Sequence, residues 1–579
     1  MVIASPIPER TAGDMARGAG STAQWVGDRA FPHWLADDLA KEARRVLAER
    51  PGRNNRRRVR AAVQKRLWRW GRYESFAWEP LAPREALPQI DPGPVLAALA
   101  GRALFAVEAA AMVKHGGSTE GIERTLAELA LDGIIQSWPS IEVLHLGRAI
   151  CRRCGETQLE QTDCYACGDK RCWLCPSCRH LGLSTGCRTI YAYPRAGGRE
   201  AGAFLPPAFR FTLTPAQQRA AGRLGEFIRS GTGEEFLVWA VCGAGKTEVV
   251  LTGIAQALSA GTRILVATPR RDVAGDLALR IASAFPGLAL AVHYGGRHQT
   301  EESDPAVVVA TTHQCLRFYE AFDLVILDEV DAFPFHGNRM LYAAVKRASR
   351  PAGRIVYLTA TPPFALASRV ADGTLPYVRL PVRPHGFPLP VPEFVRASLG
   401  RAGPGWRMPD VLAGLFTDSI ARRHAALVFV PTVNHADWLG QAISRWGRSR
   451  GVAAASLHAR DMERDEKRRA FADGRLKILV STTVLERGLT LGALDVYILY
   501  ADAEHVFDAA SLIQMSGRAG RLAADPTGRV YFIAERIGAG MRAARAAIVA
   551  ANDEAAREGF LGGECGCRQG ISGVNSSEV

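Results

Sequence analysis

Apolar residues in the later part of this chain gather in short runs, separated by longer stretches of mixed polarity. The runs show little alternation between polar and apolar residues, which is typical of strands buried on both faces of a parallel sheet. With helices in the intervening stretches, they predict a doubly wound α/β domain over 205–380, whose ligand lies at the carboxyl ends of the strands. The runs are FLVWAV (236–241), RILVAT (263–268), AVVVAT (306–311), LVILDE (324–329) and IVYLTA (355–360).

A second series of runs follows a proline-rich segment. Proline recurs between Pro362 and Pro409, and because proline fixes φ we predict a semi-rigid linker over 381–410. Beyond it we predict a second α/β domain over 411–545 and a helical, partly disordered tail over 546–579. The runs of the second domain are ALVFVP (426–431), KILVST (477–482), DVYILY (495–500) and RVYFIA (529–534).

The first part of the chain lacks such runs, and we predict a basic, mainly helical region of unknown role over 1–150. Its segment from Arg53 to Arg72 holds nine basic residues and no acidic one, interleaved with Trp68 and Trp70. Indole and guanidinium groups can stack on nucleic-acid bases and meet phosphates. A solvated helix face whose tryptophans pack into their own domain fits the segment equally well.

The net charge of the chain indicates which class of partner it binds. Its 579 residues, too many for one core, include 72 Lys and Arg against 58 Asp and Glu, a net charge of +14. Unless it reflects a general bias towards Arg and Ala, this excess indicates attraction to a polyanion, chiefly nucleic acid or an anionic membrane surface. No apolar run reaches the roughly 18 residues that span a bilayer, and a signal peptide's apolar stretch is lacking. We therefore expect a cytoplasmic protein.

Eight of the 12 cysteines lie between 151 and 187. In a reducing compartment such a cluster indicates metal ligation rather than disulfides, and each CxxC pair presents two thiolates to one tetrahedral zinc ion. We predict a zinc-binding module over 151–204, in which the first four cysteines form one site and the next four could form a second. A crossed sharing of ligands and an iron–sulfur cluster stay open. The two sets are Cys151, Cys154, Cys164 and Cys167, then Cys172, Cys175, Cys178 and Cys187.

The segment AVCGAGKT (240–247) lies between a predicted buried strand and a predicted helix. Glycines let backbone N–H groups approach a phosphate, the lysine reaches the β- and γ-phosphates, and the threonine hydroxyl ligates Mg²⁺. The N-terminus of the helix adds a partial positive charge. The segment therefore predicts an ATP site formed by Gly243, Ala244, Gly245, Lys246 and Thr247.

Two further segments supply the other groups of an ATPase. DEVD (328–331) ends a buried strand, where we expect Asp328 to hold Mg²⁺ with Thr247 and Glu329 to deprotonate the attacking water. QMSGRAGR (514–521) belongs to the second α/β domain, and its two arginines can point at the γ-phosphate from there. The site is thus expected between two domains, with the catalytic residues Lys246, Asp328, Glu329, Arg518 and Arg521.

In this order the segments resemble those of superfamily 2 helicases and translocases, over roughly 205–540. The resemblance implies two RecA-like parallel-sheet domains in tandem that bind ATP and Mg²⁺ and act on nucleic acid. It also implies that Gln217 reads the adenine and that Gly488 touches the nucleotide. Coupling of hydrolysis to nucleic-acid binding would fall to Thr359, Thr361 and Gln514. Contacts with the nucleic-acid backbone would fall to Thr268, Pro269, Arg270, Arg271, Thr311, Thr312, Thr482 and Thr483.

The position of the cysteines and the segments DEVDAFPF (328–335) and HGFPLPVP (385–392) resemble the ComFA family of late-competence DNA-uptake ATPases. In the PriA family of replication-restart helicases, the cysteine pairs lie inside the second α/β domain and the acidic motif ends in histidine. The resemblance to ComFA implies a zinc-containing, ATP-dependent translocase on single-stranded DNA. It would work at the inner face of the membrane with a competence channel and other cytoplasmic competence proteins. A PriA-like helicase that unwinds duplex DNA, and a zinc-dependent scaffold with an idle ATPase, remain alternatives.

Overall fold

We describe a computed structural model of the chain. The described residues are 90–113, 118–144, 148–195, 206–209, 212–230, 233–295, 297–299, 305–483 and 492–562, with the two short strands β1 (Ala23–Trp25) and β2 (Trp78–Pro80). The basic segment from Arg53 to Arg72 and the predicted nucleotide contact Gly488 lie outside this set.

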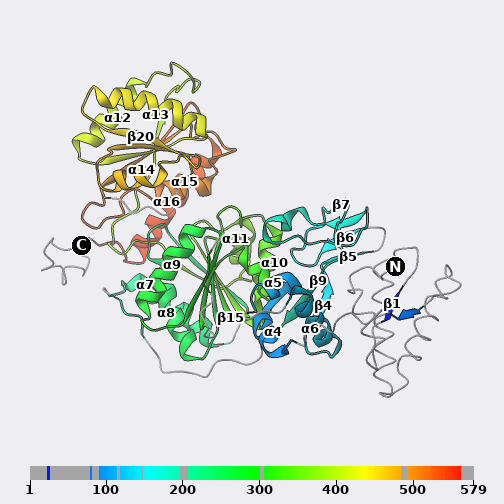
Figure 1. Cartoon of the computed structure of the whole chain (residues 1–579). Helices are drawn as coiled ribbons and strands as arrows, with labels where there is room; N and C mark the ends of the chain where they lie inside the picture. The colour runs from blue at the N-terminus through cyan, green and yellow to red at the C-terminus, as the bar shows by residue number, and fades with distance from the viewer. Residues whose placement is uncertain are drawn as a thin grey trace, which may run out of the picture.

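An eight-stranded sheet forms the centre of the first lobe, which we define as residues 206–382 (Figure 1). The strand order is β13-β12-β14-β11-β15-β16-β10-β17, and the neighbouring strands are parallel except β12 and β13. The five predicted runs are confirmed as β10 (Glu235–Ala240), β11 (Ile264–Thr268), β14 (Val307–Thr311), β15 (Phe322–Asp328) and β16 (Ser349–Thr359). Three further strands are β12 (Leu290–Tyr294), β13 (Arg297–Gln299) and β17 (Tyr377–Leu380).

Helices cover both faces of this sheet, as the unbroken apolar runs require. Alternate residues of β10 face opposite cores: Phe236 and Val238 belong to one, and Leu237 to the other. The first core includes α7 (Pro215–Ser230), α8 (Lys246–Ser259) and α9 (Arg271–Ala284). The second includes η3 (Gln314–Arg317), α10 (Arg339–Ala348) and α11 (Phe364–Ala371).

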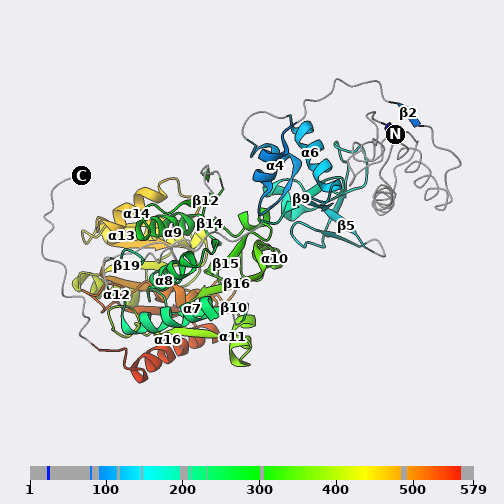
Figure 2. The same ribbon diagram turned by 90° about the horizontal axis from the view of Figure 1, so that it is seen from below.

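A six-stranded, fully parallel sheet forms the second lobe, which we define as residues 393–557. Its order is β18-β23-β22-β19-β21-β20, with helices again on both faces (Figures 1 and 2). The strands are β18 (Glu393–Arg396), β19 (Ala425–Phe429), β20 (Ala454–Leu457), β21 (Ile478–Ser481), β22 (Leu494–Leu499) and β23 (Val530–Ala534). The helices are α12 (Asp410–Ala421), α13 (Val433–Arg448), α14 (Arg464–Ala472), α15 (Ala509–Ser516) and α16 (Ala539–Arg557).

The proline-rich segment 381–410 differs from the predicted linker in one respect. Strand β18 lies within it and pairs with β23, so much of the segment is part of the second lobe. The prolines do not interrupt this strand, because Pro392 directly precedes it and Glu393–Arg396 contains none.

Helix α16 connects the two lobes. Met541 and Ala544 pack into the core of the second lobe, whereas Ala555 lies in the first core of the first lobe. Beyond the helix, Phe560 packs against that same core. In Figure 1 the helix accordingly lies at the junction of the lobes. The contact fixes the lobes close together on the side of α7.

Residues 90–195 form an N-terminal module beside the first lobe (Figure 2). It contains α4 (Pro92–Leu99), α5 (Ala106–Ala110) and α6 (Thr119–Leu131), and an antiparallel sheet of β3 (Arg102–Phe105), β9 (Thr189–Tyr193) and β4 (Gln136–Pro139). Two hairpins complete it: β5 (Ile141–Val143) with β6 (Ala149–Cys151), and β7 (Glu160–Thr162) with β8 (Cys172–Leu174). Because β9 pairs with β3 and β4, the sheet crosses the boundary predicted between residues 150 and 151.

Helices that could cross a membrane are absent from the described part of the chain, since none combines the length with the apolar character that a span needs.

Candidate active site and metal sites

The phosphate loop connects β10 to α8 at the carboxyl edge of the first sheet. Gly243 and Gly245 have φ of 81° and 83°, the left-handed region that favours glycine. A Cβ on Gly245 would lie 2.2 Å from Nε2 of Gln217. That Nε2 donates a hydrogen bond to the carbonyl of Ala244 over 3.1 Å, and Gln217 is only 2% exposed. Gln217, predicted to read adenine, therefore braces the phosphate loop.

Lys246 and Thr247 occupy the first turn of α8, whose free N–H groups and dipole favour an anion at this position. Nζ of Lys246 lies 3.7 Å from Oδ1 of Asp328. Burial opposes the charged form of the lysine, but the carboxylates of Asp328, Asp331 and Glu329 outweigh it and raise its pKa. Lys246 is therefore held as a cation among acidic groups, where a metal and a phosphate would share the charge.

Asp328 and Glu329 emerge at the end of β15, beside the phosphate loop. Glu329 has φ of 55°, a left-handed conformation that costs a non-glycine residue on the order of 1–3 kcal/mol. Its backbone N–H donates to Oδ1 of Asp328 over 2.9 Å. Both residues thus lie at the strand end beside Lys246, where a metal ligand and a base for water are expected.

Asp331 joins the residues predicted to couple hydrolysis to nucleic-acid binding. Its Oδ1 accepts a 2.7 Å hydrogen bond from the Thr359 hydroxyl, and its Oδ2 accepts one of 2.7 Å from Thr361. Oδ2 also accepts a 3.0 Å hydrogen bond from Nε2 of Gln514, which belongs to the second lobe. The carboxylate therefore connects both lobes. Sequence reasoning assigned no role to Asp331, although the DEVD segment contains it.

The arginine loop, which we define as residues 517–521, lies against the phosphate loop. A Cβ on Gly243 would be 3.8 Å from Nε of Arg521, which donates to the carbonyl of Gly517 over 2.7 Å. Burial lowers the pKa of Arg521. Arg518 is 5% exposed. The structure thus brings the predicted catalytic residues of the two lobes to one junction.

Small residues permit this approach. A Cβ on Gly517 would lie 2.3 Å from Cβ of Cys242 in the phosphate loop. The thiol of Cys242 donates to Oε1 of Gln514 over 3.1 Å. The sequence alone gives no sign of this contact, because the partners of Cys242 come from the other lobe.

The residues predicted to contact nucleic acid divide by exposure. Thr268, Thr312 and Pro269 are buried, and Thr311 is 8% exposed. Arg270 is half-buried and Arg271 is exposed, with its guanidinium 5.4 Å from the ring centre of Tyr294. Side-chain contact with a nucleic-acid strand from this group therefore rests mainly on the two arginines, because the threonines are buried. In the second lobe, Thr482 is buried and Thr483 half-buried.

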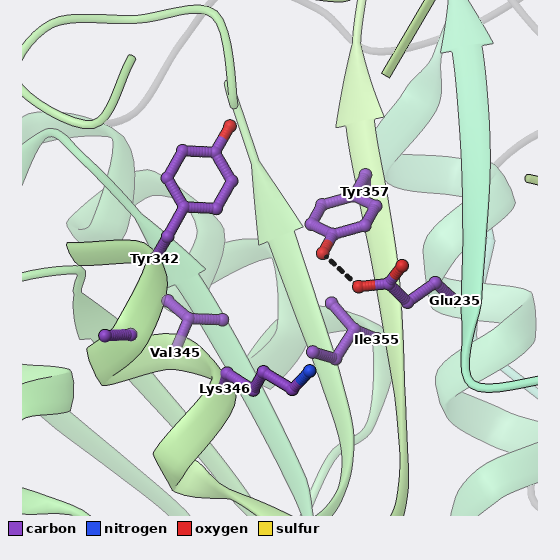
Figure 3. A pocket seen from close by; sticks show the side chains of 7 residues that line it. Glu235, Tyr342, Val345, Lys346, Ile355 and Tyr357 are labelled. Atoms are coloured by element: carbon purple, nitrogen blue, oxygen red, sulfur yellow. Dashed lines mark hydrogen bonds between the residues drawn. The ribbon is translucent and has the colours of Figure 1, made fainter. Parts of the chain in front are cut away.

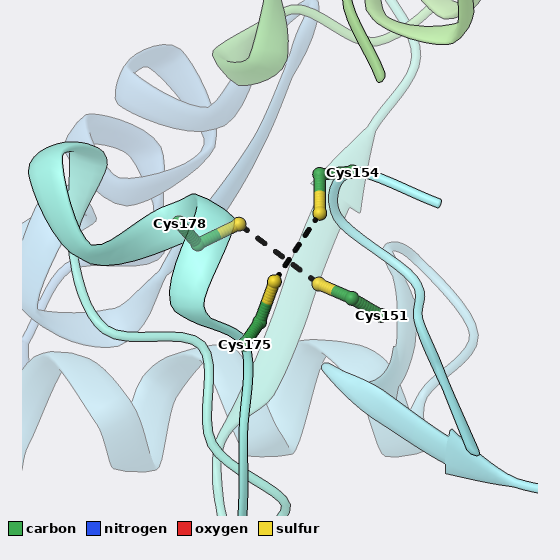
Figure 4. Close-up of side chains that lie close together, drawn as sticks. All are labelled: Cys151, Cys154, Cys175 and Cys178. Atoms are coloured by element: carbon green, nitrogen blue, oxygen red, sulfur yellow. Dashed lines mark hydrogen bonds between the residues drawn. The ribbon is translucent and has the colours of Figure 1, made fainter. Parts of the chain in front are cut away.

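The cysteines form two groups of four, and the predicted division between them is wrong. One group is Cys151, Cys154, Cys175 and Cys178 (Figure 4), and the other is Cys164, Cys167, Cys172 and Cys187. This is the crossed arrangement. The hairpin of β7 and β8 explains it, because it returns the chain after β8 to the first CxxC pair.

Both groups fit a tetrahedral zinc ion. The four sulfur atoms of each lie within 4.8 Å of one another, with 3.4 Å between Cys154 and Cys175 and 3.6 Å between Cys164 and Cys187. Four thiolates at Zn–S distances of about 2.3 Å are separated by about 3.8 Å. The first site is fully buried, whereas three of the four cysteines of the second are half-buried.

The first metal site is packed onto the first lobe. Its cysteines share one apolar core with Cys315 and Leu316 of η3. These two residues directly follow the segment TTHQ (311–314), which contains the predicted nucleic-acid contacts Thr311 and Thr312. Nη1 of Arg347, on α10, donates to the carbonyl of Arg152 in the CxxC turn over 3.2 Å. The site therefore holds the module against the lobe.

An ion-pair network extends from this site to Gln314, two residues after the predicted nucleic-acid contact Thr312. Arg153, whose side chain is 1% exposed, lies 2.6 Å from Oε1 of Glu108. Nε of Arg317 lies 3.5 Å from the same oxygen, and its Nη1 donates to Oε1 of Gln314 over 3.1 Å. Buried pairs of this kind fix relative orientation more than they add stability.

A hollow of about 180 Å³ lies at the opposite end of β10 from the phosphate loop (Figure 3). The hydroxyl of Tyr357 donates to Glu235 across it over 2.7 Å, and Tyr342 and Lys346 line it. It contains none of the predicted site residues and is separate from the nucleotide site.

Comparisons with known proteins agree with this geometry. A DEAD/DEAH box helicase model matches residues 214–369, and a helicase conserved C-terminal domain model matches 408–523. Competence protein ComFA of Bacillus subtilis is 35% identical over 401 residues, which cover 67% of this chain and 82% of that protein. The chain belongs to the ComFA family. Competence protein ComFA of Streptococcus pneumoniae is 34% identical over 71% of this chain and 91% of that protein.

Replication restart protein PriA of Bacillus subtilis matches a smaller part. It is 26% identical over 175 residues, which cover 28% of this chain and 22% of that protein. As a member of the ComFA family with both helicase domains, the chain is an ATP-binding protein whose domains imply ATPase activity.

The contact of Gly517 with Cys242 gives a first prediction. Gly517→Ala adds a methyl group where 2.3 Å is available, so the arginine loop must move away from the phosphate loop. We expect ATP turnover to fall by about 10²-fold, the cost of a misplacement near 1 Å, with nucleotide affinity little changed. Phosphate release and binding of a fluorescent ATP analogue measure the two effects.

Gly414→Ala is the matched control, because a Cβ at this exposed position on α12 would meet nothing within 4 Å. Normal turnover in Gly517→Ala would show that the two loops do not meet in the active enzyme.

The two metal sites give a second prediction. Cys154→Ser and Cys167→Ser should each lower the zinc content from two ions per chain to one. Because only the first site shares a core with the first lobe, Cys154→Ser should lower the melting temperature by roughly 4 °C or more, and Cys167→Ser by less. Elemental analysis and thermal unfolding provide the measurements. Loss of both ions from either variant would contradict two independent sites.

Proposed function

We propose that this member of the ComFA family is an ATP-dependent single-stranded DNA translocase that drives DNA uptake in natural transformation. The observation that carries the proposal is the approach of the arginine loop to the phosphate loop at the junction of the lobes. A site completed from two lobes can turn hydrolysis into relative movement of those lobes. The likeness to two competence proteins over most of their length supports the cellular role.

In this mechanism the first lobe binds ATP through the phosphate loop and the N-terminus of α8. Thr247 and Asp328 would hold Mg²⁺, which neutralises charge on the phosphates. Glu329 takes a proton from the attacking water. Arg518 and Arg521 stabilise the charge that develops on the transferred phosphoryl group.

Relative movement of the lobes is transmitted to the bound DNA strand through the hydrogen bonds of Asp331. Gln514 of the second lobe donates a hydrogen bond to the Asp331 carboxylate, which also accepts hydrogen bonds from Thr359 and Thr361 of the first lobe. Separation of the lobes after hydrolysis breaks that shared contact. Arg270 and Arg271 grip the strand on the first lobe through phosphates, without regard to sequence. Repeated closing and opening would then move the grip along single-stranded DNA.

The cellular setting belongs to the same proposal. The net charge of +14 suits a protein that works on DNA beside an anionic membrane surface. We place it in the cytoplasm, peripherally at the inner face of the membrane, with the competence channel and other cytoplasmic competence proteins as partners.

A second candidate is a PriA-like helicase that unwinds duplex DNA in replication restart or repair, which the partial match to PriA favours. An assay of strand displacement on a forked DNA duplex distinguishes the two candidate functions. A translocase for uptake hydrolyses ATP without releasing the strand, whereas a restart helicase releases it at a rate that follows hydrolysis.

A third prediction concerns stimulation by DNA. Phosphate release should rise several-fold when single-stranded DNA is added, and the stimulation should weaken as salt increases because phosphate contacts release counterions. Lys246→Ala should remove turnover at all DNA concentrations. A rate that does not respond to DNA would rule out the motor.

A fourth prediction isolates the arginine loop. Arg521→Ala should lower turnover by about 10³-fold or more, in the range known for arginine fingers. Nucleotide affinity should stay within a few fold, because the phosphate loop is untouched. Arg536→Ala, an exposed position in the same lobe, is the control. Near-normal turnover of Arg521→Ala would exclude a site shared between the lobes.

A further inference from the structure

Arg383 lies directly after the first sheet, where the chain leaves β17 for the second lobe. Its side chain is 2% exposed and is among the largest fully buried side chains of the described residues. An arginine in a segment between lobes is normally expected at the surface. Its burial at this junction requires an explanation.

The guanidinium of Arg383 binds both loops of the nucleotide site. Nε donates to the carbonyl of Cys242 in the phosphate loop over 3.0 Å. On the arginine loop, Nη2 donates to the carbonyl of Gly517 over 3.0 Å, and Nη1 to those of Ala519 and Gly520 over 2.6 and 2.5 Å. One planar group thus bonds four carbonyls that come from two lobes.

The acceptors explain how the charge is tolerated. Gly517 caps the C-terminus of α15, where free carbonyls and the helix dipole favour a cation. Burial and the neighbouring Arg521 lower the pKa of Arg383 to about 10, so it remains protonated at neutral pH. Within the described residues, the four hydrogen bonds of the guanidinium all go to backbone carbonyls. A full positive charge therefore stays beside the phosphate loop, where a nucleotide's phosphates would offset it.

We propose that Arg383 is a positioning residue for ATP hydrolysis, which holds the arginine loop against the phosphate loop. The inference rests on the proposed ATPase function. Arg383 acts through Arg518 and Arg521, because four of its five N–H groups donate to the four backbone carbonyls. Lysine cannot replace it, since one ammonium group lacks the fork that spans both loops.

A double-mutant cycle tests the proposal on the full-length, zinc-loaded protein. Arg383→Gln and Arg383→Lys should each lower kcat for ATP at saturating single-stranded DNA by about 10²-fold, with KM and nucleotide affinity within about three-fold. In the Arg521→Ala background, Arg383→Gln should cause little further loss, because both changes remove the same contribution. Arg396→Ala, at an exposed position on β18, is the control and should match the wild type.

Small-angle X-ray scattering with Mg²⁺ and a non-hydrolysable ATP analogue supplies a readout that does not need turnover. Arg383→Gln should have a larger radius of gyration than the wild type, and Arg396→Ala should not. The proposal would be overturned if Arg383→Gln had the same radius of gyration and the same kcat as the wild type. It would also be overturned if the effects of Arg383→Gln and Arg521→Ala on kcat were independent of each other. If the wild type itself fails to hydrolyse ATP, the proposed function fails, and the scattering comparison still decides the role of Arg383.

Discussion

The nucleotide chemistry of this protein depends on the packing of the phosphate loop against the arginine loop. In the proposed mechanism, the first loop binds the β- and γ-phosphates, and the second supplies the cations that a transferring phosphoryl group needs. Neither lobe holds both sets. Their approach is possible because Gly517 has no side chain to meet Cys242, and Asp331 and Arg383 bridge the gap with hydrogen bonds. The buried Arg383 and Arg518 lie there with the half-buried Lys246 and Arg521, so a polyanionic nucleotide is the natural partner of the closed arrangement.

The N-terminal module adds a fixed attachment to this engine. Its first metal site belongs to the same core as η3, which begins two residues after the predicted contact Thr312, and the Arg153–Glu108–Arg317 network reaches Gln314. A metal-held module joined in this way moves with the first lobe. Motion during hydrolysis would therefore be concentrated between the lobes and would pass to α16, which contacts both.

The sequence predicted those parts of the fold in which local pattern and burial coincide. Strands β11 and β14 are buried at every residue, so their apolar runs were visible. Strands β17, β18 and β20 were missed because they lie at or near sheet edges and are buried on alternate or few residues. The residues Lys246 and Asp328 were predicted from the chemistry of their segments, and Thr359 and Gln514 were predicted from the resemblance to superfamily 2 helicases. The cysteine grouping was not, since the spacing of CxxC pairs is the same for crossed and sequential sites. Arg383 could not be found either, because its acceptors are backbone carbonyls, which have no signature in sequence.

The central claim is that hydrolysis between the lobes moves this protein along single-stranded DNA. The dependence of the ATPase rate on the length of the single-stranded DNA tests this claim most directly. The total concentration of DNA nucleotides is held constant while the length varies. A translocase spends more time on longer strands before it reaches an end, so the account predicts a rate that rises with length and then levels off. A rate that is the same on short and long strands would contradict movement and leave an ATPase that DNA merely activates.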